Sequence, residues 1–195
     1  GGYALVAVPP QNLGCHPARF RGVAREIGLT LVHGTGYYTR PSHPPEIDDR
    51  SIDDLEAEFV ADVREGIDGT DLRAGLIGEI GVSGHIHDQE ATVLRAAARA
   101  AIRTGAPLMV HPPGRTPHAQ RDRTYPSSRW ALELLDIVEA EGLAADRVVM
   151  CHMDRTLFED ISYQLDLAAR GPYLEFDVWG LECYIQQYND GYPSD

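Results

Sequence analysis

The sequence predicts an α/β fold of parallel strands and covering helices, with the pattern of a (β/α)8 barrel of which about six units are present. Short apolar runs alternate with amphipathic segments, and each strand–helix unit spans roughly 30 to 40 residues, as right-handed βαβ crossovers do. The apolar runs show no polar alternation. Continuous apolar character is typical of strands that are buried on both faces of a parallel sheet.

Six apolar runs are predicted to form the strands. Each is short and rich in Val, Leu and Ile, a composition that buried strands favour. They cover Tyr3–Val8, Thr30–His33, Gly75–Ile80, Pro107–His111, Val148–His152 and Tyr173–Phe176.

Amphipathic helices are predicted between these runs, and each ends close to a glycine. The clearest covers Asp88–Thr104, where apolar residues recur at helical spacing, Asp88 can cap the start and Gly105 follows the end. The others cover Pro17–Ile27, Ile52–Glu65, Ser127–Glu141 and Thr156–Ala169.

The predicted units are too few for a closed barrel. The 195 residues also fall below the usual barrel length of about 250. Because an isolated arc of strands would leave two hydrophobic edges open, we expect residues 1–195 to form a single barrel domain that lacks its N- and C-terminal portions.

Composition limits the classes of partner. With 43% hydrophobic and 24% charged residues, the chain can bury one sizeable core. The formal net charge of −13 argues against a nucleic acid or an anionic membrane as partner, since both would repel an acidic surface. Every basic residue is an arginine, so no lysine is present to form the Schiff base of a metal-independent aldolase or lyase.

The three cysteines, Cys15, Cys151 and Cys183, are widely spaced and odd in number. This pattern predicts neither a disulfide framework nor a zinc ribbon, and it favours a reducing cytoplasm. No apolar run approaches the roughly 18 residues of a membrane span, and the first residues lack the pattern of a signal peptide. We therefore expect a soluble, cytoplasmic protein.

Three polar residues end apolar runs: Glu79, His111 and His152. The carboxyl ends of parallel strands gather at one rim of a barrel, so we expect these side chains to converge. Two imidazoles and a carboxylate suit a divalent metal, whose charge makes a buried carboxylate tolerable. The alternative for each residue is structural: a buried hydrogen-bonded glutamate, and core histidines that donate to backbone carbonyls.

The other histidines are weaker candidates. His85 and His87 have ligand spacing, but they lie in a predicted turn before a helix. His33 ends a strand and is expected to face the pocket, unless Gly34 and Gly36 beside it mark only a turn. Three histidines close to prolines are expected to be exposed, namely His16, His43 and His118.

Taken in order, five strand-end motifs resemble those of the phosphotriesterase family of the amidohydrolase superfamily. They are Gly34-Thr-Gly-Tyr-Tyr38, Gly75-Leu-Ile-Gly-Glu-Ile-Gly81, Leu108-Met-Val-His111, Val149-Met-Cys-His-Met153 and Leu174-Glu-Phe-Asp177. The branch of phosphotriesterase-related and resiniferatoxin-binding-like proteins is the most similar, and the resemblance covers nearly the whole chain.

The resemblance implies a (β/α)8 barrel that holds two divalent metal ions, usually zinc, with this chain supplying about strands two to seven. Glu79 matches the residue that bridges the two metals. His111 and His152 match histidine ligands of the more exposed metal, so these three are the implied catalytic and metal-binding residues. Tyr38 matches an aromatic that lines the substrate pocket, and Asp177 and Trp179 match a segment of the pocket wall.

The implied activity is hydrolysis of a lactone, ester, amide or phosphoester by a metal-activated hydroxide. The alternative is a noncatalytic barrel of the same family that binds a small ligand. The expected partner is a small-molecule substrate, and a homodimer is left open. The His-x-His of the family's first strand and the aspartate of its last strand have no counterpart here; both would lie outside this segment.

Overall fold

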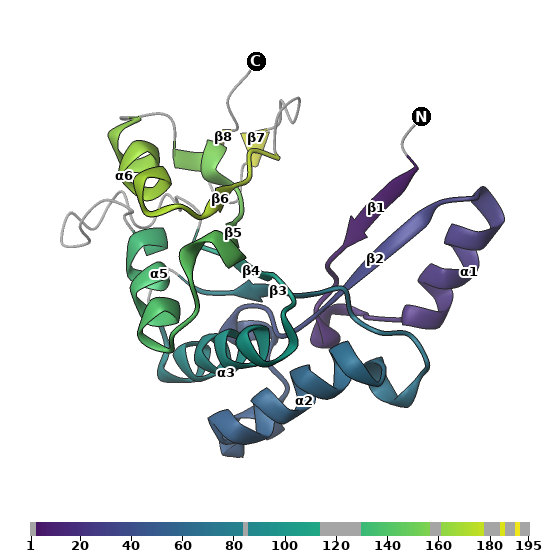
Figure 1. Cartoon of the computed structure of the whole chain (residues 1–195). Coiled ribbons are helices and arrows are strands. Elements are labelled where there is room, and N and C mark those ends of the chain that lie inside the picture. Colours follow the sequence, from purple (N-terminus) through teal and green to yellow (C-terminus); the bar gives the residue numbers. More distant parts are fainter. Residues whose placement is uncertain are drawn as a thin grey trace.

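The computed structural model describes residues 3–83, 86–113, 130–156, 161–177, 184–185 and 190–191. Six parallel strands form one curved sheet in the order in which they occur in the chain (Figure 1). They are β1 (Ala4–Ala7), β2 (Thr30–Thr35), β3 (Leu76–Gly81), β4 (Leu108–His111), β5 (Val148–Met150) and β6 (Tyr173–Leu174). Sequential parallel strands of this kind form part of a barrel wall.

The helices lie along one side of this sheet (Figure 1). They are α1 (Pro17–Ile27), α2 (Ile52–Arg64), α3 (Asp88–Thr104), α5 (Trp130–Ala140) and α6 (Ser162–Arg170). A separate antiparallel pair consists of β7 (Tyr184–Ile185) and β8 (Asp190–Gly191). In the part of the chain that the structure describes, no helix has the length and apolar character needed to cross a bilayer.

Local sequence signals explain most helix boundaries. Ser51 caps α2, because its hydroxyl accepts the Asp54 amide at 3.1 Å while the Asp54 carboxylate accepts the Ser51 amide. The predicted cap of α3 was wrong by one residue. His87 is the N-cap, Asp88 is the first helical residue, and the Glu90 carboxylate accepts the His87 amide at 3.3 Å.

The core lies between the inner strands and the helices. Leu94 and Ala97 on α3 and Leu108 and Val110 on β4 are completely buried. The two outer strands differ, since Leu5 on β1 is 51% exposed and Tyr173 on β6 is 66% exposed. The sheet is therefore buried through its centre and open at both of its outer strands. That residues 1–195 form one domain lacking its terminal portions stays a prediction.

Candidate metal centre

The structure brings Glu79, His111 and His152 together. Glu79 lies in β3, His111 is the last residue of β4, and His152 follows β5 by two residues. One ligand atom from each lies within 4.8 Å of the others. Among the described residues, this is the one group of three or more His, Cys, Asp or Glu side chains gathered so closely.

Two glycines allow the backbone around Glu79 to pass close to its neighbours. A Cβ on Gly78, whose φ is +141°, would lie 2.5 Å from the carbonyl oxygen of Met109 on β4. A Cβ on Gly81 would lie 2.7 Å from the carbonyl carbon of Tyr38. Only glycine therefore lets β3 approach both β4 and the segment that follows β2.

His152 is held by carboxylates on both sides. Its Nδ1 lies 2.8 Å from Oδ1 of Asp177, and its Nε2 lies 3.1 Å from Oε1 of Glu79. Its φ of +56° is a left-handed backbone conformation, which costs a residue other than glycine roughly 1–3 kcal/mol. An imidazole can donate to two carboxylates only when both nitrogens carry protons, whereas a cation bound by His152 and Glu79 would replace one proton.

Tyr38 engages the other histidine. Its hydroxyl lies 2.9 Å from Nε2 of His111, and the two ring centroids are 4.8 Å apart. This contact leaves Nδ1 as the His111 nitrogen that can ligate without giving up Tyr38. The imidazoles of His111 and His152 lie edge to face, with ring centroids 4.7 Å apart. Each histidine thus has one nitrogen held by a flanking side chain, the usual arrangement for metal ligands.

The electrostatics favour an ionised Glu79. Burial on its own would raise the pKa of Glu79, but the hydrogen bond with His152 and the charges of both histidines lower it below its ordinary value. Burial also raises the pKa of Glu175, as does the nearby charge of Asp177. A centre with one carboxylate and two imidazoles has the donor chemistry that a divalent cation requires.

Cys151 is a neighbour of the centre that the sequence reasoning did not include. Burial, followed by the charges of Glu79 and Glu175, raises the pKa of this thiol well above its usual range. Cys151 is therefore a neutral thiol and contacts both carboxylates as a hydrogen-bond donor. Its place directly before His152 was the only signal in the sequence.

Two predictions about other histidines were wrong. His43 is buried and not exposed, and its Nε2 lies 2.6 Å from the carbonyl oxygen of Tyr38. His33 does not face the centre; its ring packs on Phe20 of α1 at a centroid distance of 5.5 Å. His16 is exposed, as predicted. Trp179, His85 and His118 lie outside the described residues.

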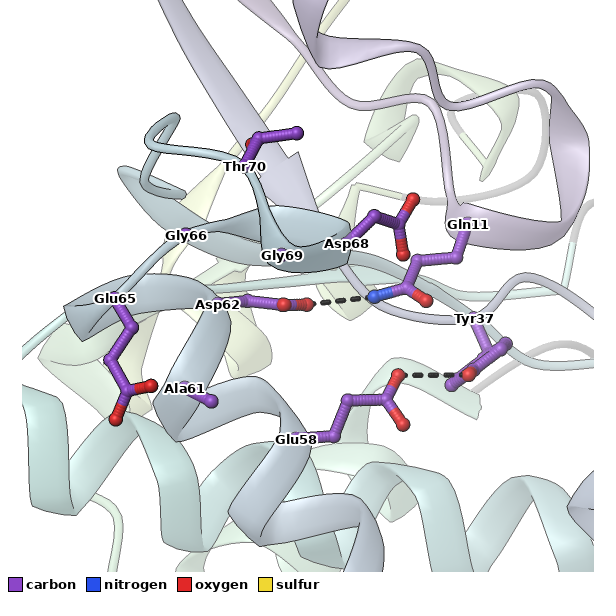
Figure 2. A pocket seen from close by; sticks show the side chains of 10 residues that line it. All are labelled: Gln11, Tyr37, Glu58, Ala61, Asp62, Glu65, Gly66, Asp68, Gly69 and Thr70. Atoms are coloured by element: carbon purple, nitrogen blue, oxygen red, sulfur yellow. Dashed lines mark hydrogen bonds between the residues drawn. The ribbon is translucent and has the colours of Figure 1, made fainter.

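A second polar cluster lies beside α2, around a pocket of about 500 Å³ that Gln11, Tyr37 and residues within 58–70 line (Figure 2). The carboxylate of Asp62 accepts a hydrogen bond from the Gln11 amide at 2.7 Å and another from the Thr35 hydroxyl. Tyr37 donates to Glu58 at 2.8 Å. These residues come from three separate segments, so no local sequence motif predicts the cluster.

Comparison with known proteins places the chain among its relatives. A model of the phosphotriesterase family matches residues 1–191. The N-acetyltaurine hydrolase of Tetraodon nigroviridis is 34% identical over 197 residues, which cover 100% of this chain and 53% of that protein. The chain spans about half the length of the curated relatives it matches.

Two solved structures are similar over nearly the whole chain. A resiniferatoxin-binding protein from Rhodobacter sphaeroides has a TM-score of 0.90 and 41% identity, and the match covers 100% of this chain and 51% of that one. A phosphotriesterase homology protein from Escherichia coli, in complex with phosphate in its active site, has a TM-score of 0.78 and 31% identity, covering 95% and 58%.

These similarities confirm the predicted fold class, since the chain with its six-stranded parallel sheet matches 51% and 58% of the length of these two (β/α)8 barrel proteins. The family match extends from the first residue through β8, and therefore includes all three residues of the candidate centre. The chain belongs to the phosphotriesterase family.

Proposed function

We propose that this chain supplies part of the active site of a metal-dependent hydrolase, with Glu79, His111 and His152 as metal ligands. The observation that carries the proposal is the convergence of these three donors within 4.8 Å at neighbouring strand ends. Membership of a family with named hydrolases supports it.

Two divalent ions, with zinc as the expected metal, would lower the pKa of bound water and polarise the bond to be cleaved. The residues of the chain have separate tasks. Glu79 supplies a partly buried negative charge that is ionised at neutral pH, because its pKa is lowered. Asp177 holds His152 through Nδ1 and thereby directs Nε2 toward Glu79.

The substrate we propose is a small carbonyl or phosphoryl compound: an amide, ester, lactone or phosphoester. An amide is the first to test, because several relatives with 32–34% identity are named N-acetyltaurine hydrolases. Tyr38 lies beside His111 at the centre and would line the substrate pocket. Asp177 and Trp179 are proposed for the pocket wall.

Noncatalytic binding of a small apolar ligand is the second candidate function. It is favoured by the 41% identity to the resiniferatoxin-binding protein, which exceeds the identity to the named hydrolases above. This reading predicts saturable binding of resiniferatoxin without turnover of any amide, ester or lactone.

The test compares Glu79→Gln and His152→Ala with the unaltered natural polypeptide that carries this sequence. We expect both variants to lose most of their bound metal, measured by elemental analysis, and to lose hydrolysis of N-acetyltaurine and of an ester and lactone panel in parallel. His16→Ala, which changes an exposed histidine, is the matched control and should keep both. Retention of metal and activity in the two site variants would show that the ligands were assigned wrongly.

A further inference from the structure

The carboxylate of Glu90 joins three segments around the candidate metal centre. Glu90 lies in the first turn of α3, and its side chain belongs to a residue with 0% exposure. One oxygen accepts the Arg40 amide at 2.7 Å and the Ser83 hydroxyl at 2.6 Å. The other accepts the Ser83 amide at 3.1 Å and the His87 amide at 3.3 Å.

Only one of these four hydrogen bonds is explained by helix capping. A glutamate at this position of a helix commonly accepts the amide of the N-cap residue, which is His87 here. The remaining three bonds go to Arg40 and Ser83, which lie outside α3. A buried carboxylate is costly unless it is fully hydrogen-bonded, so these bonds also determine where the two segments must lie.

Both segments lead directly to the candidate centre. Arg40 lies two residues after Tyr38, whose hydroxyl contacts His111. Ser83 follows Val82, whose amide donates to the carbonyl oxygen of His111 at 3.1 Å. Glu90 is therefore connected to His111 by two routes. One runs through the Arg40 amide and along the chain to Tyr38. The other runs through Ser83 and along the chain to Val82.

We propose that Glu90 is a positioning residue, whose buried carboxylate fixes the segments after β2 and β3 and so holds the Tyr38 hydroxyl on His111. The hydrogen bonds of Glu90 go to Arg40, Ser83 and His87, so it would act on His111 through Tyr38. The consequence for metal binding rests on the proposed function, whereas the consequence for the His111 ring does not.

The first measurement is made on metal-free protein. Glu90→Gln preserves the size of the side chain but leaves only one oxygen to accept. We expect the Nε2 resonance of ¹⁵N-labelled His111 to move toward its position in Tyr38→Phe, with faster hydrogen exchange at the Arg40 and Ser83 amides. The matched control is Glu56→Gln, which removes a buried glutamate that pairs with Arg103 at 2.9 Å on the helix layer; it should leave the His111 resonance unchanged.

The second measurement is a double-mutant cycle on affinity for Zn²⁺, by competition with a chromophoric chelator. Loss of a residue that orients a ligand lowers metal affinity by about 10-fold to 100-fold, so we expect about this loss in Glu90→Gln and in Tyr38→Phe. The double variant should be no weaker than the weaker single variant, because both changes release the same contact.

The outcomes separate the two proposals. The positioning role would be wrong if the His111 resonance is unchanged in Glu90→Gln, or if the losses of affinity add in the double variant. Glu90 would then act only as a helix cap. If the unaltered protein binds no Zn²⁺, the proposed function fails. The His111 resonance still decides the role of Glu90 in that case.

Discussion

Glu79 on β3 and Asp62 on α2 are two carboxylates whose pKa values are shifted in opposite directions. Glu79 lies beside two imidazoles, which more than offset the effect of burial and lower its pKa. Burial raises the pKa of Asp62 to about 6, and the charges of Glu58 and Asp68 add to this, against hydrogen bonds from Thr35 and Gln11. The neighbours of a buried acid therefore decide which protonation state folding favours.

Asp62→Asn should alter the pH dependence of stability. The pKa of Asp62 is about 6 in the folded chain against an ordinary 3.8, so ionisation penalises the folded state increasingly as pH rises from about 4 to about 6. Above that range the penalty is at most about 2–3 kcal/mol. We expect the free energy of unfolding of the variant, relative to the unaltered chain, to increase between pH 4 and pH 7 in urea titrations.

Asp71→Asn is the control, because this aspartate has a 79% exposed side chain and pairs only with Arg21 among the described residues. The difference in free energy of unfolding between Asp71→Asn and the unaltered chain should change little with pH. A difference between Asp62→Asn and the unaltered chain that stays constant with pH would contradict the assignment of a raised pKa to Asp62.

At the scale of elements, β3 is the strand on which the candidate centre depends. Its pairing with β4 changes register between Ile77 and Ile80, which is where Glu79 lies. Gly78 and Gly81 make the close approach of the neighbouring backbones sterically feasible. The main role of Gly78 and Gly81 is thus to allow the backbone position of Glu79, and not to fill the core.

Gly78→Ala should both destabilise the protein and disturb the centre. The added methyl would meet the Met109 carbonyl oxygen at 2.5 Å, at a φ of +141° that alanine rarely adopts. We expect a loss of about 1–3 kcal/mol in the free energy of unfolding, with reduced metal content.

Gly22→Ala provides the comparison, since Gly22 lies inside α1 with open space around it. Alanine there should stabilise the helix by about 0.5–1 kcal/mol and leave metal content unchanged. Equal effects of the two substitutions on unfolding would show that the tight approach of β3 to β4 is not a steric requirement.

At the scale of the whole molecule, an acidic chain with a net charge of −13 carries its candidate cation centre at the ends of three adjacent strands. The proposed ligands come from positions 79, 111 and 152, so a bound cation would cross-link three strand–helix units. Ligands that bind only the folded state stabilise it, and metal binding should therefore be linked to global unfolding.

Zinc should raise the unfolding temperature of the protein, and chelation should reverse the change. At free Zn²⁺ of about 100 times the dissociation constant, the expected gain in free energy of unfolding is about 2.7 kcal/mol. Calorimetry with and without Zn²⁺ checks this, with His152→Ala as the variant that should lose the gain. An equal gain in His152→Ala would place the stabilising zinc elsewhere.

The sequence by itself determined the elements and their order. Apolar runs and helical periodicity are local properties, so the bounds of α1 and α3 were predicted correctly and six strands were placed in the right succession. Glycines and capping residues mark where an element ends, although the cap of α3 was assigned one residue too late. Parallel topology then indicated that Glu79, His111 and His152 would lie at one rim.

Only the tertiary structure decided which side chains meet. Tyr38 and His111 are 73 positions apart, and their contact depends on the path of two segments that Glu90 joins. His33 turned toward α1 and His43 became buried, because side-chain direction follows from neighbouring segments. The pKa shift of Asp62 likewise comes from distant partners. Periodicity specifies secondary structure, but contacts and electrostatics arise only when remote segments share a small volume with little water.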